Sequence, residues 1–476
     1  MSLRASVAYI LTRAVAGALA MASLALFVRV LGPSEYAHLS LGLAAAALSS
    51  SLLIIPLNTT LGRLYGEAAL RERLIATLSM IVMAFGIVLL IAALVLEWQG
   101  ASWLARGVLP AAALFAALQG LLDFVAQWST SALQPRRYSR LLLARAVGVL
   151  LLGFLALQSS ASAPAVLLAM ALSCALSLAI SLRGSGWPSL KLYDRALQSR
   201  ILRFAAPLLL TCALSYLLQW GDRYLLARMV PLAELGRYSA LADFTQQTLI
   251  LVCSGLGSAW YPRIVQAWGA QDKLEAQRLM SRYALVALAL ILPAATGFAV
   301  LLAPLAAVLF GAAYRDLPAG LSACLVLAAI IGAAKSFYFD IPLLLAQRVW
   351  RQALGIALSA LLALLVMWLA VPLLGISGAA LGLLCGQGAG VIYSLVAGRG
   401  VLRGQLDLRA AGKLVLATLV MLAVLLCLPH DTLIALALSI VLAGASYAVM
   451  LLALDVDGLR SQWLRGWFAA YRERRR

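Results

Sequence analysis

Long apolar runs, separated by short polar clusters, occupy most of the chain. A helix that crosses the hydrocarbon core of a bilayer needs about 20 mostly apolar residues, and most of the runs are close to that length. Breaks at charged residues, prolines and glycines divide the sequence into fourteen such runs. We therefore predict transmembrane helices at residues 7–31, 37–57, 74–96, 108–133, 140–157, 164–182, 201–226, 238–260, 280–309, 318–345, 352–371, 376–397, 411–428 and 432–454.

Composition supports the same class of protein. Of the 476 residues, 64% are hydrophobic and only 12% are charged, which is typical of an all-α polytopic membrane protein. The first run contains Arg13 and is too long for the core of a signal peptide, so we expect it to be retained as a helix. The six cysteines lie within apolar runs without a C-x-x-C pair, which favours small packing residues over metal ligands.

The formal net charge of +19 would suggest nucleic acid as a partner of a soluble protein. In a membrane protein, Lys and Arg instead mark the cytoplasmic loops. With a cytoplasmic N-terminus, most of the 37 Lys and Arg residues fall on the cytoplasmic side, and the asymmetry alternates along the chain. We therefore expect both termini in the cytoplasm and no nucleic-acid partner. The basic residues expected on the outer side are Arg29, Arg106, Arg223, Arg228, Arg237 and Arg315.

A short motif follows the first predicted helix and recurs after the seventh. The sequence PSEYAHLS at residues 33–40 resembles PLAELGRYS at residues 231–239, so that Glu35 matches Glu234 and Ser40 matches Ser239. An even number of spans separates the copies, which gives both halves the same orientation in the membrane. This pattern indicates parallel repeats related by an axis along the membrane normal, with two lobes facing a central cavity.

Four motifs carry a resemblance to a known family. They are RVLGPSEYAHLS at residues 29–40, the Pro-to-GDRY-to-GRYS stretch at 207–241, LFGAAY at 309–314 and GISGAALG at 375–382. In their order and spacing they resemble motifs of the Wzx-type O-antigen and exopolysaccharide repeat-unit flippases. These flippases are members of the multidrug/oligosaccharidyl-lipid/polysaccharide exporter superfamily. The chain departs from the first motif at Ala37, where glycine is usual.

This resemblance implies two pseudo-symmetric six-helix lobes around a central cavity, two extra C-terminal helices and alternating access. The cargo would be an undecaprenyl-pyrophosphate-linked oligosaccharide, moved from the cytoplasmic to the periplasmic leaflet of the bacterial inner membrane. Coupling to a proton or sodium gradient would drive it, without another cofactor. Membrane lipids, a polysaccharide polymerase and a chain-length regulator would be the other partners.

The same reading divides the chain into consecutive parts. We expect an N-lobe at 1–182, a cytoplasmic linker at 183–203, a C-lobe at 204–400, two further helices at 411–454 and a basic cytoplasmic tail at 455–476. Basic and aromatic residues in the tail fit either an interfacial helix on the inner membrane surface or a solvated positive segment.

Three cations inside predicted helices are candidates for binding the pyrophosphate. A charge facing lipid at mid-bilayer costs about 2.5–3.5 kcal/mol, so Arg13, Arg145 and Lys335 should face a cavity or another helix. Arginine suits the task because its guanidinium binds phosphate oxygens in bidentate fashion. Alternatively, the two arginines reach the inner interface with their long stems. Lys335 could instead neutralise Asp340, although residues five apart on an α-helix point about 140° apart.

Polar stripes on the predicted helices are candidates for contacts with sugar hydroxyls. Gln119, Asp123 and Gln127 follow one another at a spacing of four, which puts them on one helix face. Hydrogen bonds between helices are the alternative role for such stripes. The side chains that we predict to bind sugar are Gln119, Gln127, Gln219, Gln246, Gln247 and Tyr338.

Buried acids are candidates for ion coupling, because a carboxylate held away from water can take up a proton. Asp123 is the first candidate, followed by Asp243 and Asp340. Asp123 could instead be a neutral or paired acid that stabilises helix packing. Asp222 and Arg223 lie at the outer edge of the seventh span. Adjacent residues on a helix point about 100° apart, so we do not expect these two to pair simply with each other. Their position suits gating or latching at the lobe interface.

Other functions find little support. The two histidines are predicted in outer loops, and the chain has no H-E-x-x-H motif and no phosphate-binding P-loop. We therefore predict neither a catalytic metal nor an ATPase. The predicted outer loops are too short for the catalytic segment of an O-antigen ligase or polymerase, which disfavours an enzyme. The remaining alternatives are a multidrug or other small-molecule antiporter and a peptidoglycan-precursor flippase.

Overall fold

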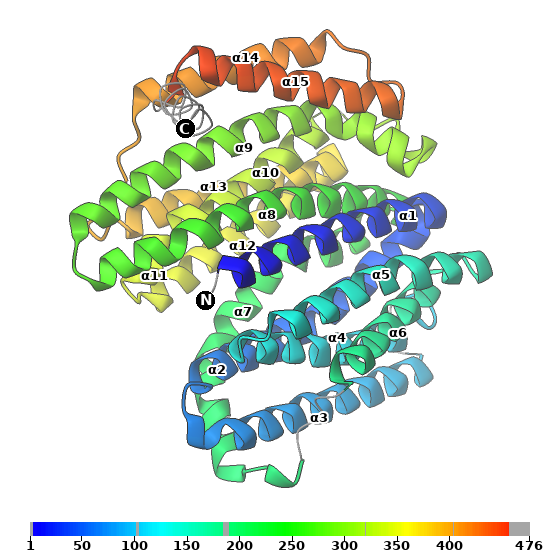
Figure 1. Cartoon of the computed structure of the whole chain (residues 1–476). Coiled ribbons are helices and arrows are strands. Elements are labelled where there is room, and N and C mark those ends of the chain that lie inside the picture. Colours follow the sequence, from blue (N-terminus) through cyan, green and yellow to red (C-terminus); the bar gives the residue numbers. More distant parts are fainter. Residues whose placement is uncertain (1–2, 101–103, 184–189, 319, 403, 457–476) are drawn as a thin grey trace, which may run out of the picture. The chain divides into compact units, whose positions relative to one another are not determined.

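The computed structural model describes residues 3–100, 104–183, 190–318, 320–402 and 404–456. In this part the chain is entirely helical and contains no strand, as predicted (Figure 1). The basic segment 459–476, which we expect at the inner membrane surface, lies outside the described residues.

The first two predicted spans are joined at a kink. Helix α1 (Leu3–Ser49) has one residue with non-helical torsions, Gly32, at φ 72° and ψ 173°. Glycine adopts positive φ without steric cost, and the following Pro33 has no N–H to donate to the helix. The second span then continues through a π-helical turn, η1 (Ser50–Ile54), into α2 (Ile55–Leu64). The break between the spans is therefore where the glycine and proline predict it.

The other predicted spans correspond to helices in order. They are α3 (Arg71–Trp98), α4 (Val108–Ser131), α5 (Pro135–Ser159), α6 (Ala163–Leu182), α7 (Arg195–Met229), α8 (Leu232–Gly269), α9 (Lys273–Phe310), α10 (Leu321–Ala334) with η5 (Lys335–Phe339) and α11 (Ile341–Leu345), α12 (Val349–Leu374), α13 (Ile376–Ala397), α14 (Leu408–Leu426) and α15 (Leu433–Ala453). The short 3-10 turns η2 (Ala68–Leu70), η3 (Leu190–Leu192) and η4 (Ala312–Tyr314) lie between them.

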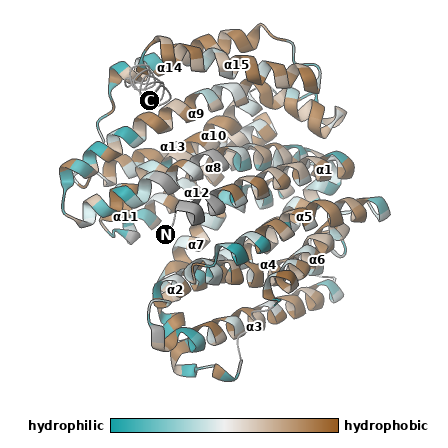
Figure 2. Cartoon of the chain, viewed as in Figure 1, coloured by the Kyte–Doolittle hydropathy of each residue, from teal (hydrophilic) through white to brown (hydrophobic). Residues whose placement is uncertain are grey.

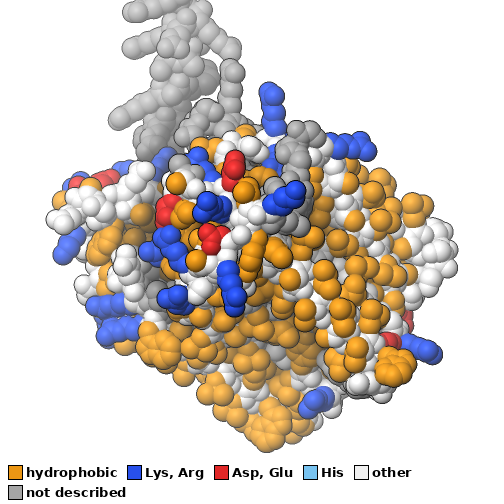
Figure 3. Space-filling view, turned by 90° about the horizontal axis from the view of Figure 1, so that it is seen from below, with side chains coloured by type: hydrophobic (Ala, Val, Ile, Leu, Met, Phe, Trp, Pro, Cys, Tyr) orange, Lys and Arg blue, Asp and Glu red, His pale blue; other side chains and the backbone are white. Residues whose placement is uncertain are grey.

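Twelve helical segments among the described residues are long and apolar enough to cross a membrane. One of them, Leu11–Leu64, contains both of the first two predicted spans, and α8 is the helix at the eighth. The chain is a multi-pass membrane protein. Figure 2 shows hydrophobic residues along the helices and hydrophilic ones mainly near helix ends, and Figure 3 shows a face on which Lys and Arg gather beside a broad hydrophobic surface.

Three helices extend beyond the limits that hydropathy predicts. α8 ends at Gly269 and α9 begins at Lys273, with only a short turn between them. The carboxylate of Asp272 accepts a hydrogen bond from the Glu275 N–H at 2.9 Å and caps α9. Asp194 caps α7 in the same way, seven residues before the predicted start. Polar residues at these ends favour helix as strongly as apolar ones, so hydropathy alone shortens the predicted helices.

The helices form two compact units. The first comprises Met1–Gln247 and Ile356–Gly386. In it α1 packs against α4, α5 and α6, while α7 packs against α1, α2 and α3. Gly382 and Gly386 allow close packing of α13 on α12, because an added Cβ would lie 2.7 Å from the Ala363 oxygen or 2.5 Å from the Ser359 oxygen. These two glycines therefore serve the packing of α13 on α12.

The second unit comprises Thr248–Gly355 and Gln387–Arg476. Its α14 and α15 form a hairpin that packs on α9, with Met421 and Leu436 in the shared apolar core. The hydroxyl of Tyr447 donates to the carbonyl of Ala289 at 2.8 Å, which ties α15 to α9. The two C-terminal helices are thus an integral part of this unit.

Candidate functional site

A fully buried arginine joins α1, α7 and α8 in the first unit. Arg223 is only 2% exposed. Its guanidinium donates to Asp222 at 2.9 Å, to the Gln219 carbonyl at 3.1 Å and to the Ser40 hydroxyl at 3.1 Å, and it pairs directly with Asp243. Each guanidinium nitrogen therefore has a partner, as a buried cation requires.

Two tyrosines complete the bonding of the acids. The Tyr36 hydroxyl donates to Asp243 at 2.8 Å, and the Tyr238 hydroxyl donates to Asp222 at 2.8 Å. Both phenols are buried, and the guanidinium also lies 4.5 Å from the centre of the Trp220 ring. We call Tyr36, Ser40, Asp222, Arg223, Tyr238 and Asp243 the outer cluster, because the sequence predicts these residues toward the outer side of the membrane.

The two copies of the repeated motif meet beside the outer cluster. A Cβ at Gly236, in the second copy, would lie 1.7 Å from the carbonyl oxygen of Pro33 in the first, so this contact requires glycine. The matching acids occupy matching places: Glu35 accepts from the N–H of Ala163, the first residue of α6, and Glu234 lies near Gly375, which precedes α13. The repeat is therefore a structural one.

The expected geometry at Asp222 and Arg223 is wrong in one respect. These neighbours do pair, because the long arginine side chain folds back toward the adjacent carboxylate. Arg223 also pairs with an acid on a neighbouring helix, Asp243 of α8. Sequence reasoning missed Tyr36, Ser40 and Tyr238, although all three stand in the repeated motif that it singled out.

A second polar group lies among α4, α5 and α6. The Gln119 amide donates to Asp123 at 2.7 Å, and the Cys174 thiol donates to the Gln119 carbonyl oxygen at 3.4 Å. Arg145 of α5 interacts electrostatically with Asp123 and with Cys174. The buried Nε of Arg145 has no hydrogen-bond partner among the described residues. We call Gln119, Asp123, Arg145 and Cys174 the N-lobe cluster.

Arg13 lies at the α1–α5 contact. Its Nε donates to the Tyr138 hydroxyl at 3.1 Å while the side chain as a whole is exposed. Nearby, Arg137 is only 4% exposed and stacks on Trp128 at 4.0 Å, with two buried nitrogens that lack hydrogen-bond partners among the described residues. Arg137 lies between the predicted spans 108–133 and 140–157, so the sequence places it in a connecting loop and does not anticipate its burial.

The predicted sugar contacts are spread over several helices. In the first unit, Gln219 and Gln247 are exposed, whereas Gln246 is half-buried. The Gln127 amide packs against α2, 3.1 Å from where a Cβ of Gly62 would lie. These stripes supply amides on helix surfaces.

In the second unit, Lys335 and Asp340 form a buried ion pair at 2.9 Å, and the Ser394 hydroxyl donates to the same carboxyl group at 2.6 Å. Our expectation that their spacing disfavours a pair is wrong. The chain turns here as a π-helix, in which the Asp340 N–H bonds to the Lys335 carbonyl and residues five apart line up. Lys335 is 3% exposed, so its charge is neutralised by Asp340 inside the protein.

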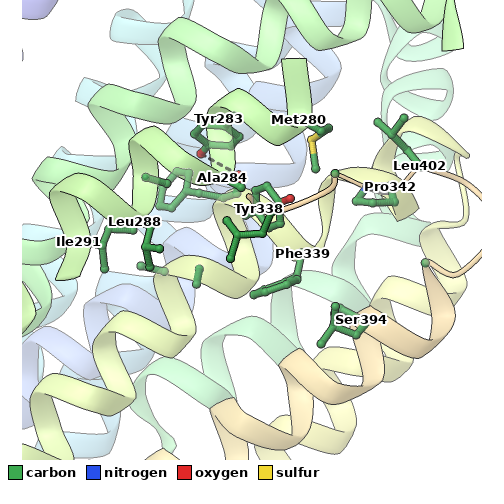
Figure 4. Close-up of a pocket in the computed structure, with 18 of the residues that line it drawn as sticks. Met280, Tyr283, Ala284, Leu288, Ile291, Tyr338, Phe339, Pro342, Ser394 and Leu402 are labelled. Carbon is green, nitrogen blue, oxygen red and sulfur yellow. Dashed lines mark hydrogen bonds between the residues drawn. The ribbon is translucent and has the colours of Figure 1, made fainter. Parts of the chain in front are cut away.

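Beside this pair the second unit has a partly open cavity of about 640 Å³. Figure 4 shows its wall, which includes Tyr283, Leu288, Tyr338 and Phe339 from α9 and η5. Tyr338 therefore contributes to an apolar surface. Among the described residues no group of three His, Cys, Asp or Glu side chains gathers closely enough to hold a metal ion.

Comparison of the sequence with known protein families identifies the family of this chain. Residues 3–268, more than half of the chain, match the family described as polysaccharide biosynthesis protein. The chain belongs to this family. No curated protein sequence matches it significantly.

Solved structures show the fold. One described as lipid II flippase MurJ in an inward closed conformation matches with a TM-score of 0.71 at 14% identity, over 96% of this chain and 99% of that one. An inward-facing multidrug resistance MATE family transporter of the MOP superfamily matches with a TM-score of 0.61 at 15% identity, over 82% and 97%. An outward-facing multidrug resistance MATE family transporter of the MOP superfamily matches with a TM-score of 0.61 at 15% identity, over 83% of this chain and 94% of that one. These likenesses show that the chain shares the fold of the three solved structures.

Proposed function

We propose that this protein moves an undecaprenyl-pyrophosphate-linked oligosaccharide repeat unit from the cytoplasmic to the periplasmic leaflet of the bacterial inner membrane. The match of residues 3–268 to polysaccharide biosynthesis proteins carries the proposal, because it ties a transporter fold to carbohydrate assembly. The MurJ-like fold is consistent with lipid-linked cargo, since that structure is described as a lipid II flippase and is matched over 99% of its length.

The pyrophosphate is proposed to bind at Arg13 and Arg145. Each guanidinium keeps hydrogen-bonding capacity, since Arg13 is exposed with one bond to Tyr138 and Arg145 has a buried Nε without a partner. Lys335, the third sequence candidate, already neutralises Asp340 and so contributes little charge to cargo. Amides on α4, α7 and α8 offer exchangeable hydrogen bonds to sugar hydroxyls.

The outer cluster is proposed to hold the outer end closed. Its hydrogen bonds join Tyr36 and Ser40, after the first span, to Asp243 and Arg223 of α8 and α7. Alternating access requires such contacts to separate when the cargo leaves. Asp222, Arg223 and Asp243 thus act as a latch, and Asp243 is less available for carrying an ion because Arg223 and Tyr36 both hold it.

Ion coupling is proposed to use Asp123. This half-buried carboxylate has a neutral partner, Gln119, and a nearby cation, Arg145, so cargo binding at Arg145 would change the electrostatic environment of the acid. A proton or sodium ion at Asp123 and pyrophosphate at Arg145 would then favour each other's binding, because the two added charges have opposite signs.

Reconstitution tests the proposal. The full chain is placed in liposomes with a fluorescent pyrophosphate-linked oligosaccharide lipid, and accessibility of the sugar in each leaflet is followed under imposed pH or sodium gradients. We expect transport that accelerates with one of the gradients and loses that response in Asp123→Asn, with Glu97→Gln as the matched carboxylate control. Transport that ignores both gradients would refute coupling, and absence of transport of any polyprenyl-linked sugar would refute the function.

A second cargo is favoured by one observation. The chain matches the lipid II flippase over almost its whole length, so a peptidoglycan precursor is a candidate with the same pyrophosphate chemistry. Supplying both lipids in the same liposome assay distinguishes them. Faster movement of the peptidoglycan precursor would favour this second function.

A further inference from the structure

The start of α5 carries a buried arginine that pairs with no carboxylate in the described part of the chain. Arg137 is only 4% exposed, and its guanidinium lies 4.0 Å from the centre of the Trp128 ring of α4. Its Nε and Nη2 atoms are closed to solvent and make no hydrogen bond to any described residue. Buried polar groups in proteins are normally hydrogen-bonded, and buried charges are paired. A ligand is therefore the natural partner of Arg137.

The packing of α6 on α5 brings a second unpartnered group to the same place. The Ser173 hydroxyl of α6 donates to the Arg145 carbonyl of α5 at 2.8 Å. One turn further along α6, Ser177 donates to the Leu141 carbonyl, so four residues forward on α6 match four residues back on α5. The next step of this register places Ser181 level with the buried arginine. The Ser181 hydroxyl is fully buried, yet it has no hydrogen-bond partner among the described residues.

The start of α5 also has charges that a helix start normally avoids. Its N-cap residue, Gln134, provides no side-chain cap for the N–H groups of the first turn. These N–H groups form the positive end of the helix dipole, where acidic side chains are favourable and basic ones are not. The first turn contains no acid but holds Arg136 and Arg137, and Arg140 follows one turn later. A bound anion would relieve this accumulation of positive charge.

The acids of neighbouring segments do not neutralise these cations. Arg137 interacts electrostatically with Arg140, which carries a like charge, and with Tyr65 at the end of α2. Glu67, which follows two residues later, accepts from Arg200 through both carboxylate oxygens. The aspartate of α4 belongs to the N-lobe cluster, where it accepts from an amide of its own helix. The junction of α4, α5 and α6 thus keeps a net positive charge.

We infer that this junction binds a phosphate group (Figure 1). Arg137 supplies two N–H donors in a fixed fork, Ser181 supplies an O–H donor, and the Arg136 N–H in the first turn of α5 supplies another. A phosphate group has several oxygens to accept these bonds, and both a guanidinium fork and a helix start suit it well. We call Arg136, Arg137 and Ser181 the phosphate site.

Binding exchanges one contact of Arg137 for stronger ones. Because Nε and Nη2 are covered in the structure, the side chain has to leave the Trp128 ring to meet an anion. It gives up a cation–π contact and gains charge-assisted hydrogen bonds, which are among the strongest in proteins. Occupancy of the phosphate site should therefore change the environment of the Trp128 indole.

Two sources can supply the phosphate group, namely the phosphodiester of an anionic phospholipid and free inorganic phosphate. The sequence predicts this end of α5 on the cytoplasmic side, just outside the span 140–157, where lipid head groups lie. The inference goes beyond the proposed function and does not depend on it, since it uses neither Arg13 nor Arg145.

Native mass spectrometry of the full chain in detergent tests the lipid source. Phosphatidylglycerol is added beside phosphatidylcholine, whose choline cancels the charge of its phosphate, and the bound lipids are counted. We expect phosphatidylglycerol to bind more tightly. Arg137→Gln should reduce this preference about tenfold, because charge-assisted hydrogen bonds are lost. Ser181→Ala should reduce it about threefold, as expected for a neutral hydrogen bond. Arg348→Gln is the control, since Arg348 is exposed in the second unit.

Tryptophan emission tests the free source. Inorganic phosphate is titrated at constant ionic strength against chloride, and the signal of Trp128 is taken as the difference between the wild type and Trp128→Phe, because the chain has 11 tryptophans. A saturable change that disappears in Arg137→Gln would assign the site to free phosphate. A preference for phosphatidylglycerol without this change would assign it to the lipid.

Two results would overturn the inference. The first is an equal preference for phosphatidylglycerol in the wild type and Arg137→Gln, together with no phosphate-dependent emission of Trp128. The second covers the case in which Arg137→Gln does not fold. Arg136→Gln then decides, because Arg136 is exposed and its loss leaves the packing intact. It should weaken binding of the preferred ligand about threefold, and wild-type binding by both Arg136→Gln and Ser181→Ala would contradict the site.

Discussion

The outer cluster and the N-lobe cluster of the first unit each place an arginine near aspartate, but they differ in how completely the arginine is hydrogen-bonded. Arg223 has a partner for each guanidinium nitrogen and is 2% exposed. Arg145 is half-buried and keeps an Nε without a partner. A saturated cation has no capacity left for a ligand, whereas an unsaturated one does. The difference therefore assigns a holding role to the first cluster and a binding role to the second.

The substitution with the largest expected effect removes the arginine of the outer cluster. Arg223→Ala leaves Asp222 and Asp243 buried without their cation, which should lower the free energy of unfolding by about 3–5 kcal/mol. Thermal unfolding in detergent measures the loss. Arg228→Ala on the same helix is the control, because Arg228 is exposed. A loss below about 1 kcal/mol would mean that the cluster contributes little to holding the helices together.

The buried pair in the second unit should show an intermediate effect. Lys335→Met removes the cation from Asp340, but the Ser394 hydroxyl still donates to the carboxylate. We expect a loss of roughly 2–3 kcal/mol in unfolding free energy, and partial recovery in Lys335→Met/Asp340→Asn, because the double variant leaves no unpaired charge. An additive double variant would show that the pair is not coupled.

A substitution of Arg145 in the N-lobe cluster should lower transport more than it lowers stability. Arg145→Gln should lower liposome transport about tenfold, equivalent to about 1.4 kcal/mol, because a charged hydrogen bond to pyrophosphate is lost. Unfolding temperature should change little. Arg140→Gln, exposed on the same helix, is the control. If Arg145→Gln unfolds the protein as Arg223→Ala does, the two clusters are not different in kind.

The smallest effect should come from an exposed pair. Arg200 donates to Glu67 at 2.9 Å and 3.2 Å, linking α7 to the α2–α3 connection, but both side chains are about half exposed. Solvent screening limits such a pair to about 1 kcal/mol or less. Glu67→Gln should therefore shift thermal unfolding only slightly, and added salt should reduce the difference between the variant and the wild type.

The predicted elements and the predicted contacts agree with the structure to different degrees. Apolar runs of sufficient length determine where helices cross, and Gly32 with Pro33 marks a break that the structure confirms. The glycine packing of α13 on α12 could also be anticipated from the sequence. The ends of α7, α8 and α9 could not, because hydropathy does not register capped polar helix ends.

The sequence by itself determined the class of protein, the order and number of the spans and the repeat that relates its halves, because these depend on local hydropathy and motif spacing. Tertiary structure decided what each charge does. Arg223 meets Ser40 across 183 residues, and Lys335 meets Asp340 only because a π-turn aligns residues five apart. Such pairings depend on which helices lie together and how each backbone turns, and helical periodicity carries neither piece of information.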